Sequence, residues 1–172
     1  SADLTALATT PVAVVCAGVK AVLDLPRTVE ALETLGVPIV GQETDVMPEF
    51  WTRGGDLPVS VRSDRPTTTA GILHAHWGCG LLSGVVVANP IPATDEADPQ
   101  TIADAIVGGL AAADAAGVHG RDVTPFLLAH IGQTTRGASL EANVALVKHN
   151  AAVAAEIATA LAALPTLGVG RN

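Results

Sequence analysis

The residue with the clearest potential for covalent chemistry is Lys20, which comes shortly after an apolar run that ends at Cys16. The chain has two lysines against seven arginines, so lysine is not its usual surface cation. Apolar neighbours remove solvation from a charged amine and lower its pKa towards neutrality. A neutral amine can attack a carbonyl carbon and form a Schiff base, which a guanidinium group cannot do. The alternative is an ordinary surface lysine that pairs with Asp24, one helical turn further on.

Three further polar positions could contact a substrate, and each has a structural alternative. The segment Ser1-Ala2-Asp3 brings a hydroxyl and a carboxylate to a predicted helix start, where they could cap the helix or bind a sugar phosphate. Asn143 stands among Ala and Val on the last predicted helix, and its amide could cap a neighbouring loop or reach a substrate. Asn89 follows a predicted strand and either lines the same pocket or forms an ordinary turn.

Other chemical motifs are weak in this sequence. The five histidines are predicted to be structural, and His74 and His76, two residues apart, fall on different faces of a helix. Arg53-Gly54-Gly55 could offer amides and a guanidinium to a phosphate, or simply form a turn. The sequence contains no nucleotide-binding glycine fingerprint, P-loop or nucleophile elbow.

Short β-branched runs alternate with helical stretches along the chain, which is typical of an α/β fold. Strands are expected at 12–16, 37–40 and 84–88, with a short edge strand at 59–62. Helices are expected at 26–35, 66–80, 98–116 and 139–164, with a shorter one that opens at Thr124-Pro125. Ligands of such folds bind at the carboxyl ends of strands, which is where Lys20 falls.

Composition excludes several classes of function. The chain is 49% hydrophobic and 15% charged, with a mean hydropathy of +0.44. Charged and polar residues interrupt the most apolar stretch, 142–164, which predicts a buried or interface helix and not a membrane span. A net charge of -8 with scattered cations argues against nucleic acid as a partner. Cys16 and Cys79 are predicted to be free buried thiols, and we expect a cytoplasmic location.

The predicted sheet is short for so many helices. Its outer strands would expose unpaired backbone groups and apolar faces. Because the chain also starts at Ser1 and not at a methionine, we expect the sheet to continue in a missing segment or a partner chain.

Several segments in order resemble the pseudouridine-5'-phosphate glycosidases, also called the indigoidine-synthase-A-like family. They span nearly the whole chain. The stretches are Ser-Ala-Asp-Leu at 1–4, Thr-Pro-Val-Ala-Val-Val-Cys-Ala-Gly-Val-Lys at 10–20, Leu-Pro-Arg-Thr at 25–28, Val-Ala-Asn-Pro-Ile-Pro at 87–92, Val-Thr-Pro-Phe-Leu-Leu at 123–128 and Ser-Leu-Glu-Ala-Asn-Val-Ala-Leu-Val-Lys at 139–148.

The resemblance implies an enzyme that cleaves the C–C glycosidic bond of pseudouridine 5'-phosphate to uracil and ribose 5-phosphate. It implies that Lys20 forms the Schiff base, that Ser1, Ala2 and Asp3 contact the substrate, and that Asn143 supplies an active-site amide. The implied fold is a three-layer α/β/α sandwich with a mixed, largely parallel sheet, here incomplete. A homotrimer and manganese are also implied by the resemblance.

The resemblance also predicts what is missing. The family's proton-donating glutamate, a second substrate lysine and the metal-binding aspartate belong to an N-terminal half that is absent here, so the metal ligand is expected upstream of Ser1. Residues 1–172 are therefore predicted to be the C-terminal part of one domain, inactive alone. Two alternatives remain: a C-glycosynthase that joins ribose 5-phosphate to an aromatic acceptor, and an inactive sugar-phosphate-binding or oligomerisation module.

Overall fold

The computed structural model describes residues 2–19 and 24–165, which form four strands, six α-helices and one short 3-10 helix. The elements in chain order are α1 (Ala2–Thr9), β1 (Ala13–Cys16), α2 (Leu25–Thr34), β2 (Ile39–Gln42), β3 (Val61–Ser63), α3 (Pro66–Gly78), β4 (Val85–Ala88), α4 (Pro99–Ala115), η1 (Gly120–Asp122), α5 (Val123–Thr134) and α6 (Ala138–Ala162).

The four strands form one sheet in the order β1-β4-β2-β3, and every described pair of strands is parallel. An isolated antiparallel bridge joins Val46 to Pro58, outside the strands. The predicted α/β class is confirmed, and β3 is an edge strand as expected. β1 forms the other edge.

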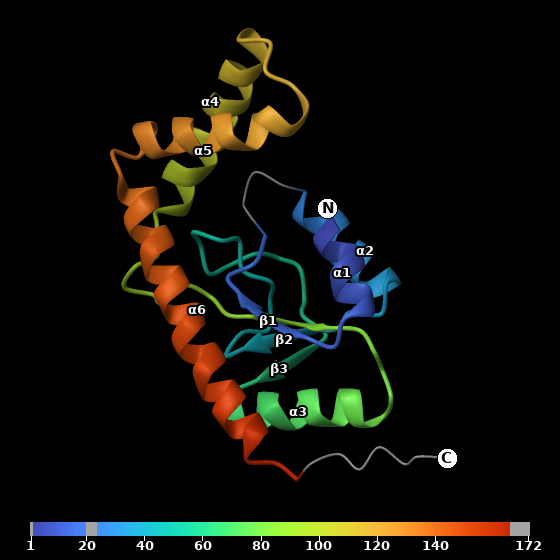
Figure 1. The fold of residues 1–172 in the computed structure, drawn as a ribbon. Coiled ribbons are helices and arrows are strands. Elements are labelled where there is room, and N and C mark those ends of the chain that lie inside the picture. Colours follow the sequence, from blue (N-terminus) through green and yellow to red (C-terminus); the bar gives the residue numbers. More distant parts are fainter. Residues whose placement is uncertain (1, 20–23, 166–172) are drawn as a thin grey trace.

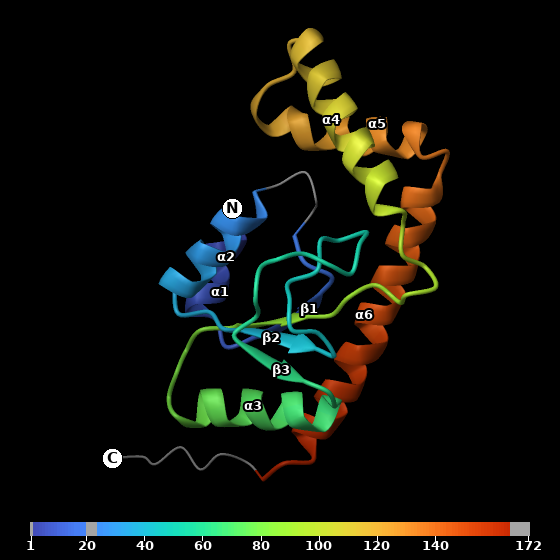
Figure 2. The same ribbon diagram turned by 180° about the vertical axis from the view of Figure 1, so that it is seen from behind.

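Helices cover both faces of the sheet, which makes three layers (Figures 1 and 2). On one face, α1 and α2 pack over Ile39, Val86 and Ala88. On the other face, α3 and α6 pack over Val40 and Val87. These strand residues are 4% exposed or less, because a parallel sheet is stable only when both faces are covered.

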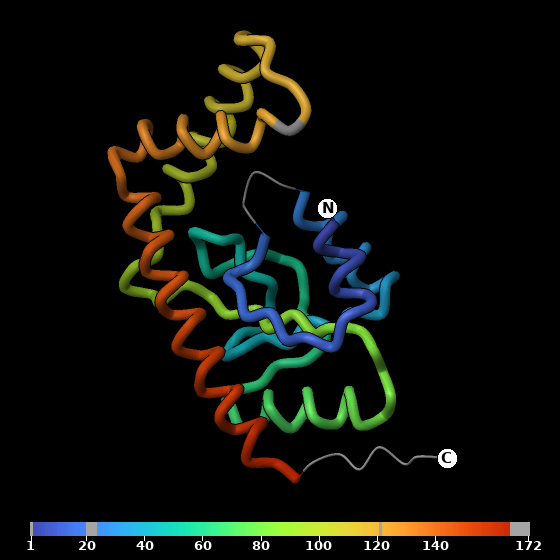
Figure 3. Tube along the Cα trace, viewed as in Figure 1, coloured from blue at the N-terminus to red at the C-terminus, as the bar shows by residue number. Residues whose placement is uncertain are grey.

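A third apolar cluster lies beyond the carboxyl ends of β1 and β4. Helices α4 and α5 pack against each other and project past the sheet (Figure 3). The cluster ties them to α6 and to the loops that follow the strands, through Ala17, Trp51, Ile91, Ile102, Ala105, Ile131, Ala142 and Leu146. The cluster lies at the end of the sheet where ligands of α/β folds usually bind.

Local signals explain most of the element boundaries. Asp98 caps α4, and hydrogen bonds from the Thr101 hydroxyl (2.6 Å) and amide (2.8 Å) hold the pKa of its carboxyl below the ordinary value. The second strand, expected at 37–40, lies instead at Ile39–Gln42 and continues through Gly41. Glycine is needed there for close approach: a Cβ would lie 2.1 Å from the Thr44 carbonyl oxygen.

Helix α6 is apolar on more than one side. Ala142, Leu146, Val153 and Ile157 are buried, while Leu140, Val144 and Val147 are exposed on another side of the helix. Within the described ranges it is the one helix whose length and composition would allow a membrane crossing, a test that core helices also pass. In the most apolar stretch of 18 residues in α6, 17% is buried.

Both cysteines are free thiols, as predicted. Cys16 is half-buried at the end of β1, and desolvation raises the pKa of its thiol. The expected burial of Cys79 is wrong, because this residue ends α3 at the surface and is exposed.

Candidate functional site

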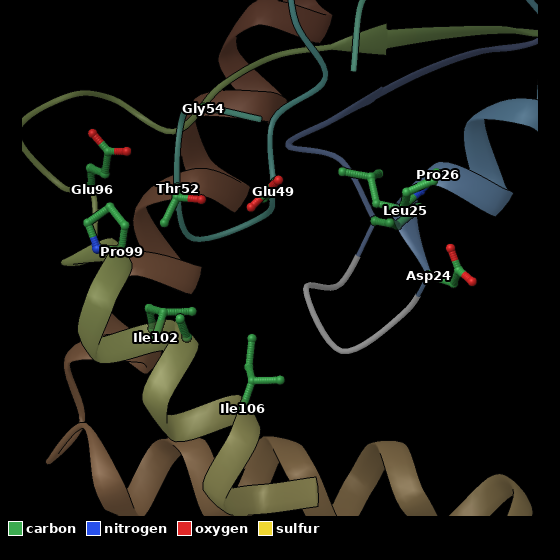
Figure 4. Close-up of a pocket in the computed structure, with 12 residues that line it drawn as sticks. Asp24, Leu25, Pro26, Glu49, Thr52, Gly54, Glu96, Pro99, Ile102 and Ile106 are labelled. Atoms are coloured by element: carbon green, nitrogen blue, oxygen red, sulfur yellow. The ribbon is translucent and has the colours of Figure 1, made fainter. Parts of the chain in front are cut away.

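A cavity of about 410 Å³ lies where loops and helices meet beyond the carboxyl end of β1 (Figure 4). Val19 and Asp24 both line it, and in the sequence they flank residues 20–23. The remaining wall comes from α2, from the loop after β2, and from α4 with the segment that precedes it. These lining residues are Leu25, Pro26, Glu49, Thr52, Gly54, Glu96, Pro99, Ile102, Ala103 and Ile106.

The cavity has an apolar floor and acidic walls. Leu25 of α2 and Ile102 and Ile106 of α4 present carbon to it, and the carboxylates of Asp24, Glu49 and Glu96 also line it (Figure 4). Apolar side chains disfavour charge on a nearby amine, whereas carboxylates favour it and can also accept hydrogen bonds from sugar hydroxyls.

Close backbone contacts fix the loop that forms one wall. The Phe50 amide donates to the Ala17 carbonyl oxygen at 2.8 Å, which joins the loop after β2 to the end of β1. Gly18 has a φ of +92°, and a Cβ there would lie 1.9 Å from the Pro48 carbonyl oxygen. The Trp51 indole nitrogen, itself buried, donates to the Ser139 carbonyl oxygen at 3.0 Å. The wall is therefore held between β1 and α6.

Arg53 holds the same loop from the other side. Its guanidinium donates to the Ile91 carbonyl oxygen at 2.5 Å, and its amide donates to the Glu96 carboxylate at 2.7 Å. For Arg53-Gly54-Gly55 these contacts favour a structural turn over phosphate binding, because the guanidinium is already bound to backbone.

The predicted catalytic residue, Lys20, and the predicted substrate contact, Ser1, lie outside the described residues. Asp24 accepts a hydrogen bond from the Arg27 amide at 3.0 Å and caps α2. Ala2 and Asp3 occupy the exposed first turn of α1, so the predicted helix start is confirmed. Their contact with a sugar phosphate stays a prediction, since the cavity is lined by other residues.

The structure places Asn143 in a different cavity, of about 650 Å³. This second cavity is lined by Phe50, Trp51 and Asn143 together with parts of α5. Since Glu49 and Thr52 line the first cavity, the segment 49–52 separates the two. In the described part of the chain, the half-buried Asn143 side chain makes no hydrogen bond, which leaves its amide available to a ligand.

Asn89 has a structural role that the sequence did not settle. It is 2% exposed, and its side-chain nitrogen donates to Asn150 Oδ1 at 2.9 Å. The bond ties the end of β4 to α6. In the sequence Asn150 stands out only as one of the polar residues that interrupt the apolar stretch 142–164, although it follows Asn143 by two helical turns.

Sequence reasoning also missed Glu49, Thr52 and Glu96 as cavity residues. Glu49 carried a usable signal, because it follows β2, and the carboxyl end of β2 points to the same side of the sheet as that of β1. Glu96 carried no such signal, since its place depends on the Arg53 amide from a distant loop.

The described histidines and acids do not assemble into a metal centre. His74 Nε2 lies 2.8 Å from the Pro165 carbonyl oxygen, and His76 Nε2 lies 3.1 Å from that of Ser83, as structural histidines do. Across residues 2–19 and 24–165 no three His, Cys, Asp or Glu side chains are grouped so that they could hold a metal ion. Within these ranges the manganese expectation therefore finds no ligand set.

Fold and cavity together define a parallel α/β unit with a ligand-sized cavity beyond the carboxyl ends of its strands. The family model described as indigoidine synthase A like protein matches residues 1–160. The chain therefore belongs to the indigoidine-synthase-A-like family.

Relatives of this family carry a specific activity in their names. A pseudouridine-5'-phosphate glycosidase of Methylobacterium nodulans is 53% identical over 161 residues, which cover 94% of this chain and 48% of the relative. Another, from Hahella chejuensis, is 52% identical over 158 residues, which cover 92% of this chain and 52% of the relative. The chain spans about half the length of the curated relatives it matches.

Two solved structures share the fold. The prealnumycin C-glycosynthase AlnA, in complex with ribulose 5-phosphate, has a TM-score of 0.89 and 36% identity over 95% of this chain and 54% of its own. An indigoidine synthase A-like protein of Thermotoga maritima has a TM-score of 0.81 and 32% identity over 92% of this chain and 52% of its own.

Proposed function

We propose that this chain forms the lysine-bearing half of a pseudouridine-5'-phosphate glycosidase, which releases uracil and ribose 5-phosphate through a Schiff base on Lys20. The observation that carries the proposal is a cavity that Val19 and Asp24 help to line. The chain that contains it is 53% identical to the pseudouridine-5'-phosphate glycosidase of Methylobacterium nodulans. Activity is assigned to the chain together with the part of the relatives that it does not match.

The reaction explains why an amine is needed. A carbon–carbon bond to uracil offers no heteroatom leaving group, so protonation of a glycosidic oxygen, as in ordinary glycosidases, is unavailable. The neutral amine of Lys20 instead adds to C1' of the ribose while the C1'–O4' bond breaks and O4' takes a proton. The ring is then open and the sugar is covalently held.

The second step breaks the carbon–carbon bond. The lone pair of the Lys20 nitrogen forms an iminium with C1' while the bond between C1' and uracil C5 breaks. The electron pair of the broken bond stays on uracil C5, which takes up a proton. Water then hydrolyses the iminium, which frees ribose 5-phosphate and returns Lys20 to its amine form. A positioned proton donor for C5 typically contributes about 10² to 10⁴-fold in rate.

The described residues support this chemistry in two ways. The apolar side chains of Leu25, Ile102 and Ile106 disfavour charge on an amine, and the carboxylates of the same cavity can take up the proton that the amine must lose. The carboxylates of Glu49 and Glu96 are positioned to accept hydrogen bonds from hydroxyls of an opened sugar.

A second candidate is a C-glycosynthase that joins ribose 5-phosphate to an aromatic acceptor. The TM-score of 0.89 with prealnumycin C-glycosynthase AlnA favours it, and a lysine Schiff base would serve both reactions. Product analysis separates the two: the glycosidase releases uracil from pseudouridine 5'-phosphate, whereas the synthase consumes ribose 5-phosphate only with an aromatic acceptor.

The two lysines of the chain allow a matched test of the Schiff base. The chain is co-expressed with the unmatched part of the Methylobacterium nodulans relative, incubated with ribose 5-phosphate, reduced with borohydride and mapped by mass spectrometry. We expect a sugar adduct on Lys20 that Lys20→Arg abolishes, because a guanidinium cannot condense with an aldehyde.

The control is Lys148→Arg, which removes the other lysine from the exposed side of α6 and should leave the adduct and uracil release intact. Uracil release by Lys20→Arg at the wild-type rate would contradict the proposal. A complex that forms but gives no adduct on Lys20 would favour a non-catalytic sugar-phosphate-binding module.

A further inference from the structure

Thr52 has a buried side chain whose hydroxyl group is not used by the fold. The residue is 6% exposed, and in the described part of the chain its hydroxyl makes no hydrogen bond. Among the described residues, no side-chain nitrogen or oxygen that is sealed from solvent lacks a partner. The Thr52 hydroxyl is therefore the open part of an otherwise buried residue, and it opens into the first cavity, which Thr52 lines (Figure 4).

Three carboxylates line the same cavity, and two of them already hold backbone amides. Asp24 accepts from the Arg27 amide at 3.0 Å and caps α2. Glu96 accepts from the Arg53 amide at 2.7 Å. Glu49 is half-buried, and within residues 2–19 and 24–165 its side chain makes no hydrogen bond or ion pair. Both of its carboxylate oxygens are therefore available to a ligand.

Glu49 and Thr52 belong to one tight turn of the loop after β2. The Glu49 amide donates to the Thr52 carbonyl oxygen at 3.1 Å, which closes the turn. The turn is anchored to the end of β1, because the Phe50 amide donates to the Ala17 carbonyl oxygen at 2.8 Å. In the sequence, Ala17 lies three residues before Lys20. The two open side chains therefore stand beside the strand end from which the chain continues to Lys20.

The charge of the cavity decides which part of a sugar phosphate this pair can hold. Its described lining contains three carboxylates and no lysine, arginine or histidine. Such a wall repels a phosphate group, whereas a sugar hydroxyl can donate to the Glu49 carboxylate and accept from the Thr52 hydroxyl. A hydrogen bond to an ionised carboxylate is also stronger than one between neutral groups. The pair therefore suits a carbon that carries a hydroxyl and not the phosphate end.

We propose that Glu49 and Thr52 bind the hydroxyl on C2 of the ribose chain, and so select ribose phosphates over 2-deoxyribose phosphates. C2 is the carbon next to the one that bonds to Lys20. The inference rests on the proposed function for the place of that bond, while the two open side chains are features of the fold itself. A sugar without this hydroxyl leaves both groups unpaired, which is how sites of this kind reject an analogue.

A comparison of two sugars tests this assignment. The complex used for the Lys20 adduct is incubated with ribose 5-phosphate or with 2-deoxyribose 5-phosphate and reduced with borohydride. The concentration that gives half of the maximal adduct on Lys20 is measured for each sugar, and the ratio of the two concentrations is the selectivity. Because the two sugars differ in intrinsic reactivity, the ratio of each variant is compared with that of the wild-type complex.

Four variants separate the hydroxyl, the charge and the fold. Thr52→Val removes the hydroxyl with little change in shape, and Glu49→Gln removes the negative charge. We expect each to lower the selectivity about tenfold by weakening ribose 5-phosphate, while 2-deoxyribose 5-phosphate stays within about twofold. Thr52→Ser keeps a hydroxyl and should keep the wild-type ratio. Asp56→Asn is the control, since Asp56 is exposed on the same loop and outside the cavity lining.

Several results would overturn the proposal. They are an equal weakening of both sugars by Thr52→Val, an unchanged ratio in both Thr52→Val and Glu49→Gln, or a loss with Asp56→Asn as large as that with Glu49→Gln. Circular dichroism checks the fold of each variant. If Thr52→Val does not fold, Glu49→Gln carries the test, because in the described structure no hydrogen bond depends on the Glu49 side chain.

Calorimetry with the Lys20→Arg complex separates this inference from the proposed function, because binding to that complex requires no covalent bond. Suppose that this complex prefers ribose 5-phosphate, that Thr52→Val abolishes the preference, and that the wild type gives no adduct on Lys20. The inference then stands and the Schiff base is removed. An adduct on Lys20 with a selectivity that no variant changes keeps the proposed function and removes the inference.

Discussion

At the scale of residues, the two asparagines of α6 show how one side-chain type serves two purposes. Asn150 accepts a hydrogen bond from buried Asn89, and so joins α6 to the end of β4. Asn143, two turns earlier, makes no hydrogen bond in the described structure and lines a cavity. The first amide is used by the fold, and the second is available to a ligand.

This difference gives a prediction for paired substitutions. Asn89→Ala removes the donor to Asn150 and should lower the free energy of unfolding by about 1–3 kcal/mol, because a partly buried amide loses its partner. Asn143→Ala should change that free energy by no more than about 0.5 kcal/mol. Urea unfolding followed by circular dichroism measures both.

Activity should respond in the opposite order. In the complex with the part of the Methylobacterium nodulans relative that this chain does not match, Asn143→Ala should lower kcat/KM for uracil release, while Asn89→Ala should retain it wherever the protein stays folded. Equal losses of stability in both variants would show that Asn143 is a packing residue and not a ligand contact.

At the scale of elements, the loop from 43 to 58 positions the candidate site, and it was the least predictable segment. Pro26, Asp98 and Pro99 predicted the starts of α2 and α4, because a helix start depends on residues close to it in the sequence. The loop depends instead on distant contacts, such as the Phe50 amide with Ala17. Phe50 even adopts a φ of +68°, which its side chain gives no reason to expect.

The contact between this loop and the end of β1 can be tested at Gly18. Gly18→Ala should destabilise the chain by several kcal/mol, because a Cβ would lie 1.9 Å from the Pro48 carbonyl oxygen and the φ is +92°. Gly36→Ala is the control: its φ is +68° but nothing lies within 4 Å of the added Cβ, so only about 1–2 kcal/mol should be lost. Thermal unfolding of both variants separates backbone strain from steric clash, and equal losses would refute the close approach.

At the scale of the whole molecule, the sequence was sufficient for the fold class but not for the site. Apolar runs such as Val85–Ala88 specify buried parallel strands without reference to other segments. The separation of Asn143 from the first cavity follows from Trp51, whose indole reaches the Ser139 carbonyl oxygen on α6. A contact between residues so far apart in the sequence leaves no local pattern.

In the described sheet β1 is an edge strand, and Val14 on it and Val12 beside it are exposed, so a partner that covered them should stabilise the folded chain. A partner that binds only the folded chain stabilises it by RT ln(1 + [L]/Kd), which is about 2.7 kcal/mol at a hundredfold excess over Kd. For a chain of 172 residues, this corresponds to a rise in Tm of roughly 5 to 10 °C.

We therefore expect Tm to increase with the concentration of the complementary half from the Methylobacterium nodulans relative. The same titration with Val14→Lys should show little increase, and with Val61→Lys a full one, since β1 is an uncharged edge strand whereas the β3 edge already carries the ion-paired Arg62. The wild-type chain could also capture its partner while its Tm stays constant over the titration. That result would mean that the partner binds the unfolded chain as well as the folded one. It would also mean that the sheet is complete without the partner.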